Sequence, residues 1–281
     1  MQGNSLEKSM NKNNNETKVL LKEELDENIL RLTLNDSERR NALSLEMIRQ
    51  MSDAIQNASL NQKIKVIIIA AIAPTFCAGH DLKEMTAARK HSDQGCAFYA
   101  ELFSSCSALM QLIINSPKPI IAEVSGVATA AGCQLVASCD IAIASDQATF
   151  ATPGVNIGLF CSTPMVALSR NIANKHAMEM LLTGEMIDAS KAKEIGLVNH
   201  VVKESHLSAR TTKLAALIAS KSSVTVSLGK ETFYRQLNQP LNEAYKLCSE
   251  VMTHDMLKDE AKEGINAFLN KRLPDWKIED E

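Results

Sequence analysis

Residues 76–85 read Phe76-Cys77-Ala78-Gly79-His80-Asp81-Leu82-Lys83-Glu84-Met85, and residues 126–135 read Gly126-Val127-Ala128-Thr129-Ala130-Ala131-Gly132-Cys133-Gln134-Leu135. Each stretch follows an apolar run, 65–71 in the first case and 118–124 in the second. An apolar run that passes through small residues into a helix start is typical of a strand, a turn and a helix in succession. The two stretches therefore predict two similar strand-turn-helix units about 50 residues apart.

The beginnings of the two predicted helices suggest a chemical role. A helix N-terminus leaves several backbone N–H groups without partners inside the helix, and the aligned peptide dipoles place partial positive charge there. Two such ends directed at one point would hold a developing oxyanion, which contributes strongly to catalysis. We therefore predict that the two stretches form the two halves of an oxyanion hole.

Composition narrows the class of protein. The chain has 281 residues, of which 45% are hydrophobic and 22% are charged, and this balance is typical of a soluble globular protein. The formal net charge of −3 and the aromatic content of 4% give no reason to expect nucleic acid as a partner. We also expect no membrane partner, because no apolar run reaches the roughly 18 residues that a membrane span requires.

The cysteines and the first residues bear on the cellular compartment. The seven cysteines include no Cys-x-x-Cys pair, and no histidines cluster at ligand spacing, so we expect reduced thiols and no metal site. Residues 1–18 are rich in Asn, Lys, Glu and Ser and predict a disordered polar tail. These features favour a cytoplasmic location, with the mitochondrial matrix as the alternative for a eukaryotic source.

Strand and helix patterns alternate through the first part of the chain. Ser44 is a predicted N-cap for a helix whose apolar residues recur at helical spacing. The unbroken apolar run at 66–72 suits a strand that is covered on both faces. Further strands are predicted at 28–34, 118–124 and 140–144, and helices at 96–114 and from about 131. This order predicts an α/β fold with largely parallel strands and right-handed connections.

The last third of the chain reads as mostly helical. A strand-like stretch at 197–202 precedes the predicted helices, which span 203–220, 223–236, 240–254 and 258–271. We therefore predict an α/β core at 19–195, followed by a helical C-terminal region at 196–281 that belongs to the same domain.

Several short motifs, in this order and spacing, resemble the crotonase (enoyl-CoA hydratase/isomerase) superfamily from about residue 20 to 275. Three longer strings, 78–84, 128–135 and 150–156, are similar to one subgroup of that superfamily. The resemblance implies a crotonase (ClpP-like) fold of repeated ββα units, with C-terminal helices that build a homotrimer or a dimer of trimers. The motifs are Arg40-Asn41-Ala42-Leu43, residues 76–85, Pro119-Ile120-Ile121-Ala122 with Gly126, Gly132-Cys133 with Cys139-Asp140-Ile141-Ala142, Leu182-Thr183-Gly184, Gly196-Leu197-Val198 and Phe268-Leu269-Asn270-Lys271-Arg272.

The resemblance also implies a ligand, an acyl thioester of coenzyme A, and no cofactor beyond the coenzyme within that substrate. In the superfamily two backbone N–H groups hold the thioester oxygen, and they correspond here to His80 and Ala131. Relatives commonly have Gly at the second position, and Ala keeps the amide if its φ is negative. Lys271 matches a basic residue that reaches a coenzyme phosphate on a neighbouring subunit. The predicted coenzyme wall comprises Arg40, Ala42, Leu43, Ala78, Asp81, Leu82 and Lys83.

The sequence departs from the hydratases at the two acid/base positions. Hydratases of the superfamily hold a water between two glutamates, and these correspond here to Gln134 and Gly154. Gln exchanges no proton near neutral pH and Gly has no side chain. We therefore expect neither efficient hydration nor simple double-bond isomerisation, although an intact oxyanion hole still stabilises an enolate.

Several alternatives remain open at this stage. Gly79-His80-Asp81 also resembles the first loop of methylmalonyl-CoA decarboxylases, and loss of both glutamates equally fits a catalytically silent acyl-CoA-binding protein. An RNA-binding role, known from one branch of the superfamily, is disfavoured because no lysine-rich helix is present. For His80 we expect a role for the amide alone, with the imidazole turned away or packed on Phe76. Asp140 is expected to be a structural acid that closes the loop before its strand.

Overall fold

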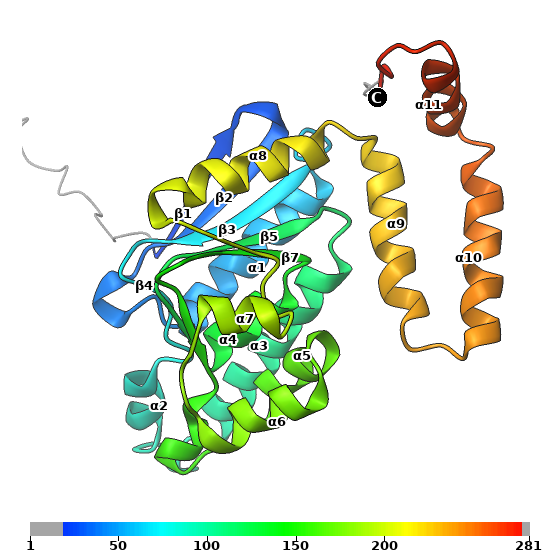
Figure 1. Ribbon diagram of the computed structural model, residues 1–281. Coiled ribbons are helices and arrows are strands. Elements are labelled where there is room, and N and C mark those ends of the chain that lie inside the picture. Colours follow the sequence, from blue (N-terminus) through cyan, green and yellow to red (C-terminus); the bar gives the residue numbers. More distant parts are fainter. Residues whose placement is uncertain (1–18, 277–281) are drawn as a thin grey trace, which may run out of the picture.

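The computed structural model describes residues 19–276, so the predicted disordered tail at 1–18 lies outside the described residues. The chain forms one six-stranded and one four-stranded sheet, with helices packed around them. Three C-terminal helices stand apart from the sheets as an arm (Figure 1). This architecture confirms the predicted α/β class with a helical C-terminal region.

The large sheet has the strand order β1-β2-β3-β5-β7-β10. Only β1 runs antiparallel to its neighbour β2, and every other neighbouring pair in this described sheet is parallel, as predicted. Since β10 pairs with β7, a strand from the predicted C-terminal region completes the core sheet. The strands are β1 (Leu20–Leu25), β2 (Ile29–Leu34), β3 (Val66–Ala71), β5 (Ile120–Val124), β7 (Ile141–Ser145) and β10 (His200–Val202).

The small sheet is built from strands of two or three residues in the order β4-β6-β8-β9. Three of them directly follow a strand of the large sheet: β4 follows β3, β6 follows β5, and β8 follows β7. This succession of two strands, with a helix after the first two pairs, agrees with the ββα units that the resemblance implied. The strands are β4 (Thr75–Cys77), β6 (Val127–Thr129), β8 (Thr149–Ala151) and β9 (Ile187–Asp188).

The large sheet is apolar on both faces, as the run at 66–72 predicted. Ile67 and Ile69 of β3 point into the main core, where α1 (Leu45–Leu60) and α3 (Cys96–Asn115) pack. Val66 and Ile68 alternate to the other face and pack beneath α8 (Leu207–Ala219). Since α8 covers the sheet, it belongs with the core and the arm begins after it (Figure 1).

Helix α3 departs from one expectation. Within residues 19–276 it is the one helix long and apolar enough to cross a membrane by length and composition, contrary to the prediction that no stretch would qualify. Its Leu102, Leu109 and Ile113 are fully buried in the main core. One face of α3 therefore packs in the core of the folded domain.

The remaining helices complete the body and form the arm. In the body, α2 (Leu82–Ala88) follows β4 and α4 (Ala131–Ser138) follows β6. Helices α5 (Pro164–Asn171) and α6 (Asn174–Thr183) lie between β8 and β9, and α7 (Ala189–Glu194) follows β9. The arm consists of α9 (Ser223–Gln236), α10 (Leu241–Asp255) and α11 (Asp259–Leu269). Within residues 19–276, four short 3₁₀ helices lie at Asp26–Asn28, Ser37–Arg39, Pro153–Ile157 and Glu204–His206.

A buried ionic network fixes the first helix of the arm to the core. The Lys230 ammonium on α9 lies 2.7 Å from Oδ2 of Asp140 and also donates to the carbonyl oxygens of Ile113 and Lys118. The Tyr234 hydroxyl donates to the other Asp140 oxygen at 2.9 Å, and the amide of Ile120 donates to Oδ2 at 2.7 Å. Asp140 is therefore a structural acid before β7, as expected, and it also holds α9.

Candidate active site

The two loops singled out in the sequence lie against each other. Gly79 has φ +94°, and a Cβ added there would lie 2.9 Å from Cβ of Ala130 and 3.4 Å from the amide nitrogen of Ala131. The Thr129 hydroxyl donates to the carbonyl oxygen of Ala78 at 3.1 Å. Only a residue without a side chain permits this approach, so Gly79 brings His80 beside the start of α4.

The backbone at the start of α4 is set by Ala130. Ala130 is the N-cap residue of α4 and has φ +50° and ψ −119°, whereas Ala131 is the first helical residue and lacks a positive φ. The condition for keeping the Ala131 amide is therefore met, and the unusual conformation falls one residue earlier. Within the described chain, neither the Ala131 amide nor the His80 amide donates a hydrogen bond.

The predicted coenzyme wall runs along the first loop. The Ala78 amide donates to the carbonyl oxygen of Arg40 at 3.1 Å, and the Leu43 amide donates to that of Gly79 at 2.7 Å. Ala42 and Leu43 are buried, whereas the Arg40 residue is exposed. The segment 40–43 therefore lies directly beside the loop that carries the His80 amide.

Asn41 holds this wall in place, a role that the sequence analysis did not assign. Arg40 and Asn41 both have positive φ, at 55° and 52°. The fully buried Asn41 amide group donates to the carbonyl oxygens of Ile72 and Thr75, at 2.8 and 2.6 Å. Asn tolerates the left-handed region better than most residues, and its presence in the Arg40-Asn41-Ala42-Leu43 motif was the available signal.

Asp81 has a structural task at the start of α2. Its carboxylate accepts hydrogen bonds from the amides of Lys83 and Glu84, at 2.8 and 3.3 Å, and lies 3.6 Å from the Arg39 guanidinium. Asp81 is 6% exposed, whereas Leu82 and Lys83 lie exposed on the first turn of α2. Asp81 therefore caps the helix, and Leu82 and Lys83 are free to contact a ligand outside the first loop.

The His80 imidazole is turned into the protein rather than away from it. Its Nδ1 lies 3.2 Å from the carbonyl oxygen of Leu43, and its ring meets that of Phe103 edge-on at a centroid distance of 5.3 Å. The expected packing against Phe76 is wrong, because α3 supplies Phe103 instead. Burial lowers the pKa of His80, and the hydrogen bond to Leu43 only partly opposes that effect.

The two positions of the lost glutamates differ in what replaces them. Gln134 is buried on α4, and its Oε1 has no hydrogen-bond partner among the described residues. Gly154 is also buried, and a Cβ there would lie 2.6 Å from the carbonyl oxygen of Leu159 and 2.9 Å from Sγ of Cys161. The segment 159–161 therefore occupies the space into which a side chain at position 154 would project.

The cysteines near the site are poor nucleophiles. Burial raises the pKa of Cys133 to about 12 and also raises that of Cys161 above its ordinary value. A thiol with a raised pKa carries little thiolate at neutral pH. Both residues act as small apolar groups in the packing beside Gln134 and Gly154.

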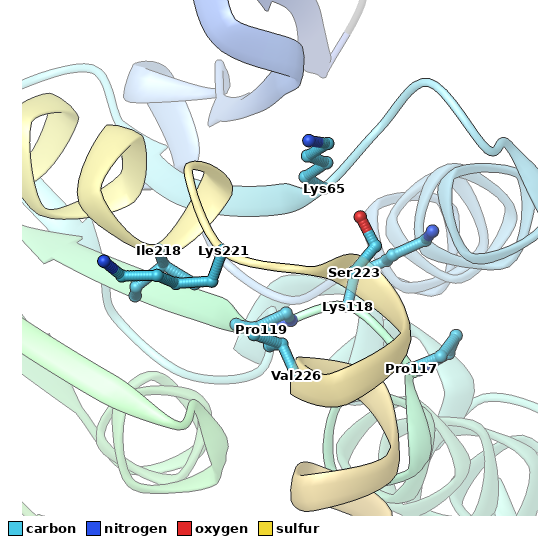
Figure 2. A pocket seen from close by; sticks show the side chains of 8 residues that line it. All are labelled: Lys65, Pro117, Lys118, Pro119, Ile218, Lys221, Ser223 and Val226. Carbon is cyan, nitrogen blue, oxygen red and sulfur yellow. The ribbon is translucent and has the colours of Figure 1, made fainter. Parts of the chain in front are cut away.

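Two basic features lie away from the loops. Lys271 is exposed at the end of α11, at the far end of the arm from α2 in Figure 1, so a single chain does not bring it to the predicted wall. A small pocket at the junction of α8 and α9 is lined by Lys65, Lys118 and Lys221. Figure 2 shows the side chains of Lys118 and Lys221 pointing to opposite sides, so they do not converge on one point.

Two sheets built from paired strands, with two glycine-containing loops that meet at the N-terminus of α4, define a crotonase-type protein. The sequence pattern of the family described as "Enoyl-CoA hydratase/isomerase" matches residues 24–279. This chain belongs to the enoyl-CoA hydratase/isomerase family.

Relatives from one subgroup are similar over most of the chain. Mouse "Enoyl-CoA hydratase domain-containing protein 3, mitochondrial" is 52% identical over 248 residues, which cover 88% of this chain and 81% of that protein. The human protein of the same name is 52% identical over 252 residues, with coverage of 89% and 81%.

Solved structures agree with the fold. The crystal structure of human enoyl coenzyme A hydratase domain-containing protein 3 is 49% identical, with a TM-score of 0.87 and coverage of 92% of this chain and 100% of that chain. The crystal structure of an enoyl-CoA hydratase from Mycobacterium smegmatis is 43% identical, with a TM-score of 0.88 and coverage of 92% and 98%. The crotonase fold inferred from the motifs is therefore confirmed.

Proposed function

We propose that the protein acts on acyl-CoA thioesters of fatty-acid metabolism and stabilises a thioester enolate between the amides of His80 and Ala131. The observation that carries this proposal is the close approach of Gly79 to Ala130 and Ala131, which brings the two amide-bearing loops together. Both N–H groups lack partners within the described chain and are available to a ligand oxygen. Donors placed in this way bind an enolate oxygen more strongly than a neutral carbonyl.

Hydration is not the reaction that this site favours. Addition of water across a double bond needs one group to remove a proton and another to deliver one. Gln134 supplies neither, and at Gly154 the neighbouring Leu159 and Cys161 fill the space in place of a carboxylate. The chemistry that remains is a proton transfer or a loss of CO₂ through an enolate, within the lyase or isomerase class of the family.

A catalytically silent acyl-CoA-binding protein is the second candidate. It is favoured by the replacement of both glutamates while the converging loops are kept. The two candidates differ in one measurable respect: a binding protein takes up acyl-CoA without promoting exchange of the Cα proton.

The test is a pair of measurements on the full-length protein. Calorimetry reports the affinity for a saturated acyl-CoA, and NMR reports deuterium uptake at its Cα. Ala131→Pro deletes one N–H donor and should slow exchange by about 100-fold or more, whereas Ala131→Gly keeps the donor and serves as the control. Wild-type protein that neither binds acyl-CoA nor promotes exchange would refute the oxyanion hole, and binding without exchange would favour the silent binding protein.

The same family membership supports a proposal for the assembly and the location. We propose a homotrimer or a dimer of trimers, which would place Lys271 of one subunit beside the coenzyme site of another. The names of the mouse and human relatives include the word mitochondrial, and they support the mitochondrial matrix over the cytoplasmic location expected from the sequence. Cell fractionation with an antibody to the protein tests the location.

A further inference from the structure

We infer that His80 contributes its imidazole as well as its amide, and that Nε2 accepts the proton removed from Cα of the bound acyl group. This inference rests on the proposed function, because it requires a thioester oxygen held by the amides of His80 and Ala131. It assigns the base of the reaction to a residue outside the two positions where hydratases carry glutamates.

The hydrogen bonds of the ring determine which nitrogen is free. A carbonyl oxygen only accepts hydrogen bonds, so the contact of Nδ1 with Leu43 at 3.2 Å requires the proton to sit on Nδ1. Nε2 then carries a lone pair. This atom is buried and has no hydrogen-bond partner among the described residues.

A buried polar atom without a partner is uncommon, because its desolvation costs about 1–3 kcal/mol. Edge-on packing against Phe103 holds the ring and supplies no donor to Nε2. Protein atoms cover Nε2 in the free chain, so a ligand reaches it only when the ring or the segments around it shift as the ligand enters. The proposed function assigns the amide of the same residue to the thioester oxygen, and Cα of the acyl group is two bonds from that oxygen.

The surroundings keep this nitrogen in the basic form. Burial lowers the pKa of His80, so the neutral ring persists below its ordinary titration range. The ring contacts the Leu43 carbonyl and the Phe103 ring of α3, and both are uncharged. Among the described residues no charged side chain contributes to this pKa shift. The carboxylates of Asp81 and Glu84, which follow in the chain, lie 3.6 and 3.9 Å from the Arg39 guanidinium.

The step balances without any further reactant. The Cα–H bond breaks and an Nε2–H bond forms, while the electron pair of the C–H bond moves to make the Cα–C1 double bond of the enolate. The thioester oxygen takes the negative charge and is held by the two amides. Return of the proton to Cα gives exchange, and its delivery to Cγ of a 3-enoyl thioester gives the 2-enoyl isomer with no water added.

The experiment removes the imidazole and leaves the amide. His80→Phe keeps a ring against Phe103, and His80→Gln provides a second variant if the first fails to fold. Both are compared with wild-type protein for affinity toward a saturated acyl-CoA and for the pH dependence of deuterium uptake at Cα. The wild-type rate should rise with pH through a pKa below 6.5 and then level off. The variants should bind within about threefold of wild type and exchange at least about 100-fold more slowly, with no inflection.

The outcomes separate the two proposals. Unchanged exchange in a folded variant would overturn the role of the imidazole and leave the oxyanion hole in place. Binding without exchange in wild-type protein would also overturn it and favour the silent binding protein. Failure of wild-type protein to bind acyl-CoA would refute the proposed function itself.

Discussion

Sγ of Cys161 lies 2.9 Å from the point that a Cβ on Gly154 would occupy. The position of the second hydratase glutamate is therefore closed by the neighbouring chain. Gly154→Glu, alone or with Gln134→Glu, should destabilise the protein and restore no hydration, because the carbonyl oxygen of Leu159 is backbone and cannot move aside like a side chain. Thermal unfolding and crotonyl-CoA hydration measure both effects.

A matched glycine gives the control for that substitution. Gly229 lies in α9 with nothing within 4 Å of an added Cβ. Gly229→Ala should leave the unfolding temperature unchanged or raise it, since Ala favours a helix over Gly by about 1 kcal/mol. A stable Gly154→Glu protein with rapid hydration would show that segment 159–161 is readily displaced.

Hydration by the wild-type protein should itself be very slow. Loss of one acid or base group commonly costs about 10²–10⁴-fold in rate, and two positions are altered here. The measurement is the crotonyl-CoA hydration rate of purified protein beside a relative that has both glutamates. A rate within about tenfold of that relative would contradict the prediction that hydration needs acid/base groups at positions 134 and 154.

Gly79→Ala tests the contact between the two loops. The residue has φ +94°, and the new methyl group would press on Ala130, so acyl-CoA affinity should fall sharply and stability should drop by about 1–3 kcal/mol. Gly196→Ala is the control, because φ there is +86° while the nearest atom is 3.8 Å away. Gly196→Ala therefore introduces the same backbone strain as Gly79→Ala, but its methyl group makes no close contact with a neighbouring residue. Calorimetry of both variants should show that binding is lost only with Gly79→Ala.

Lys230→Met should destabilise the fold. The variant leaves Asp140 without its ammonium partner, and removing one member of a buried ion pair costs about 3–5 kcal/mol. Lys191→Met is the comparison, since its pair with Glu194 is exposed and should contribute at most about 1 kcal/mol. Urea unfolding measures both. An equal, small effect would mean that the Asp140 network adds nothing beyond a surface pair.

The arm should mediate assembly through exposed apolar residues. Phe268 and Leu269 on α11 are 82% and 72% exposed in the single chain, which is unusual for large apolar side chains in adjacent positions. Light scattering should give a trimer or hexamer for wild-type protein and a smaller species for Phe268→Glu. Gln56→Glu on α1 adds the same charge elsewhere and should change nothing. A stable wild-type monomer at micromolar concentration would remove this role of the arm and weaken that of Lys271.

Sequence reasoning located most helices and large-sheet strands because each buries a long periodic or unbroken apolar run. Helix α9 was predicted at 223–236, and it begins and ends at those two residues. The two- and three-residue strands of the small sheet are too short to show a period, so they came only from the resemblance. The motifs located both loops, but the partners of the His80 ring could not be predicted. Leu43 and Phe103 are distant in sequence, and contacts of that kind are set by tertiary packing.

The two ends of α4 have different neighbours. Ala131 begins the helix beside Gly79, and Asp140, just beyond its last residue, holds Lys230 of the arm. Helix α4, of about two turns, therefore connects the residue that anchors α9 to the Ala131 amide. We therefore expect a displacement of α9 to be transmitted through Asp140 and α4 to the position of the Ala131 amide.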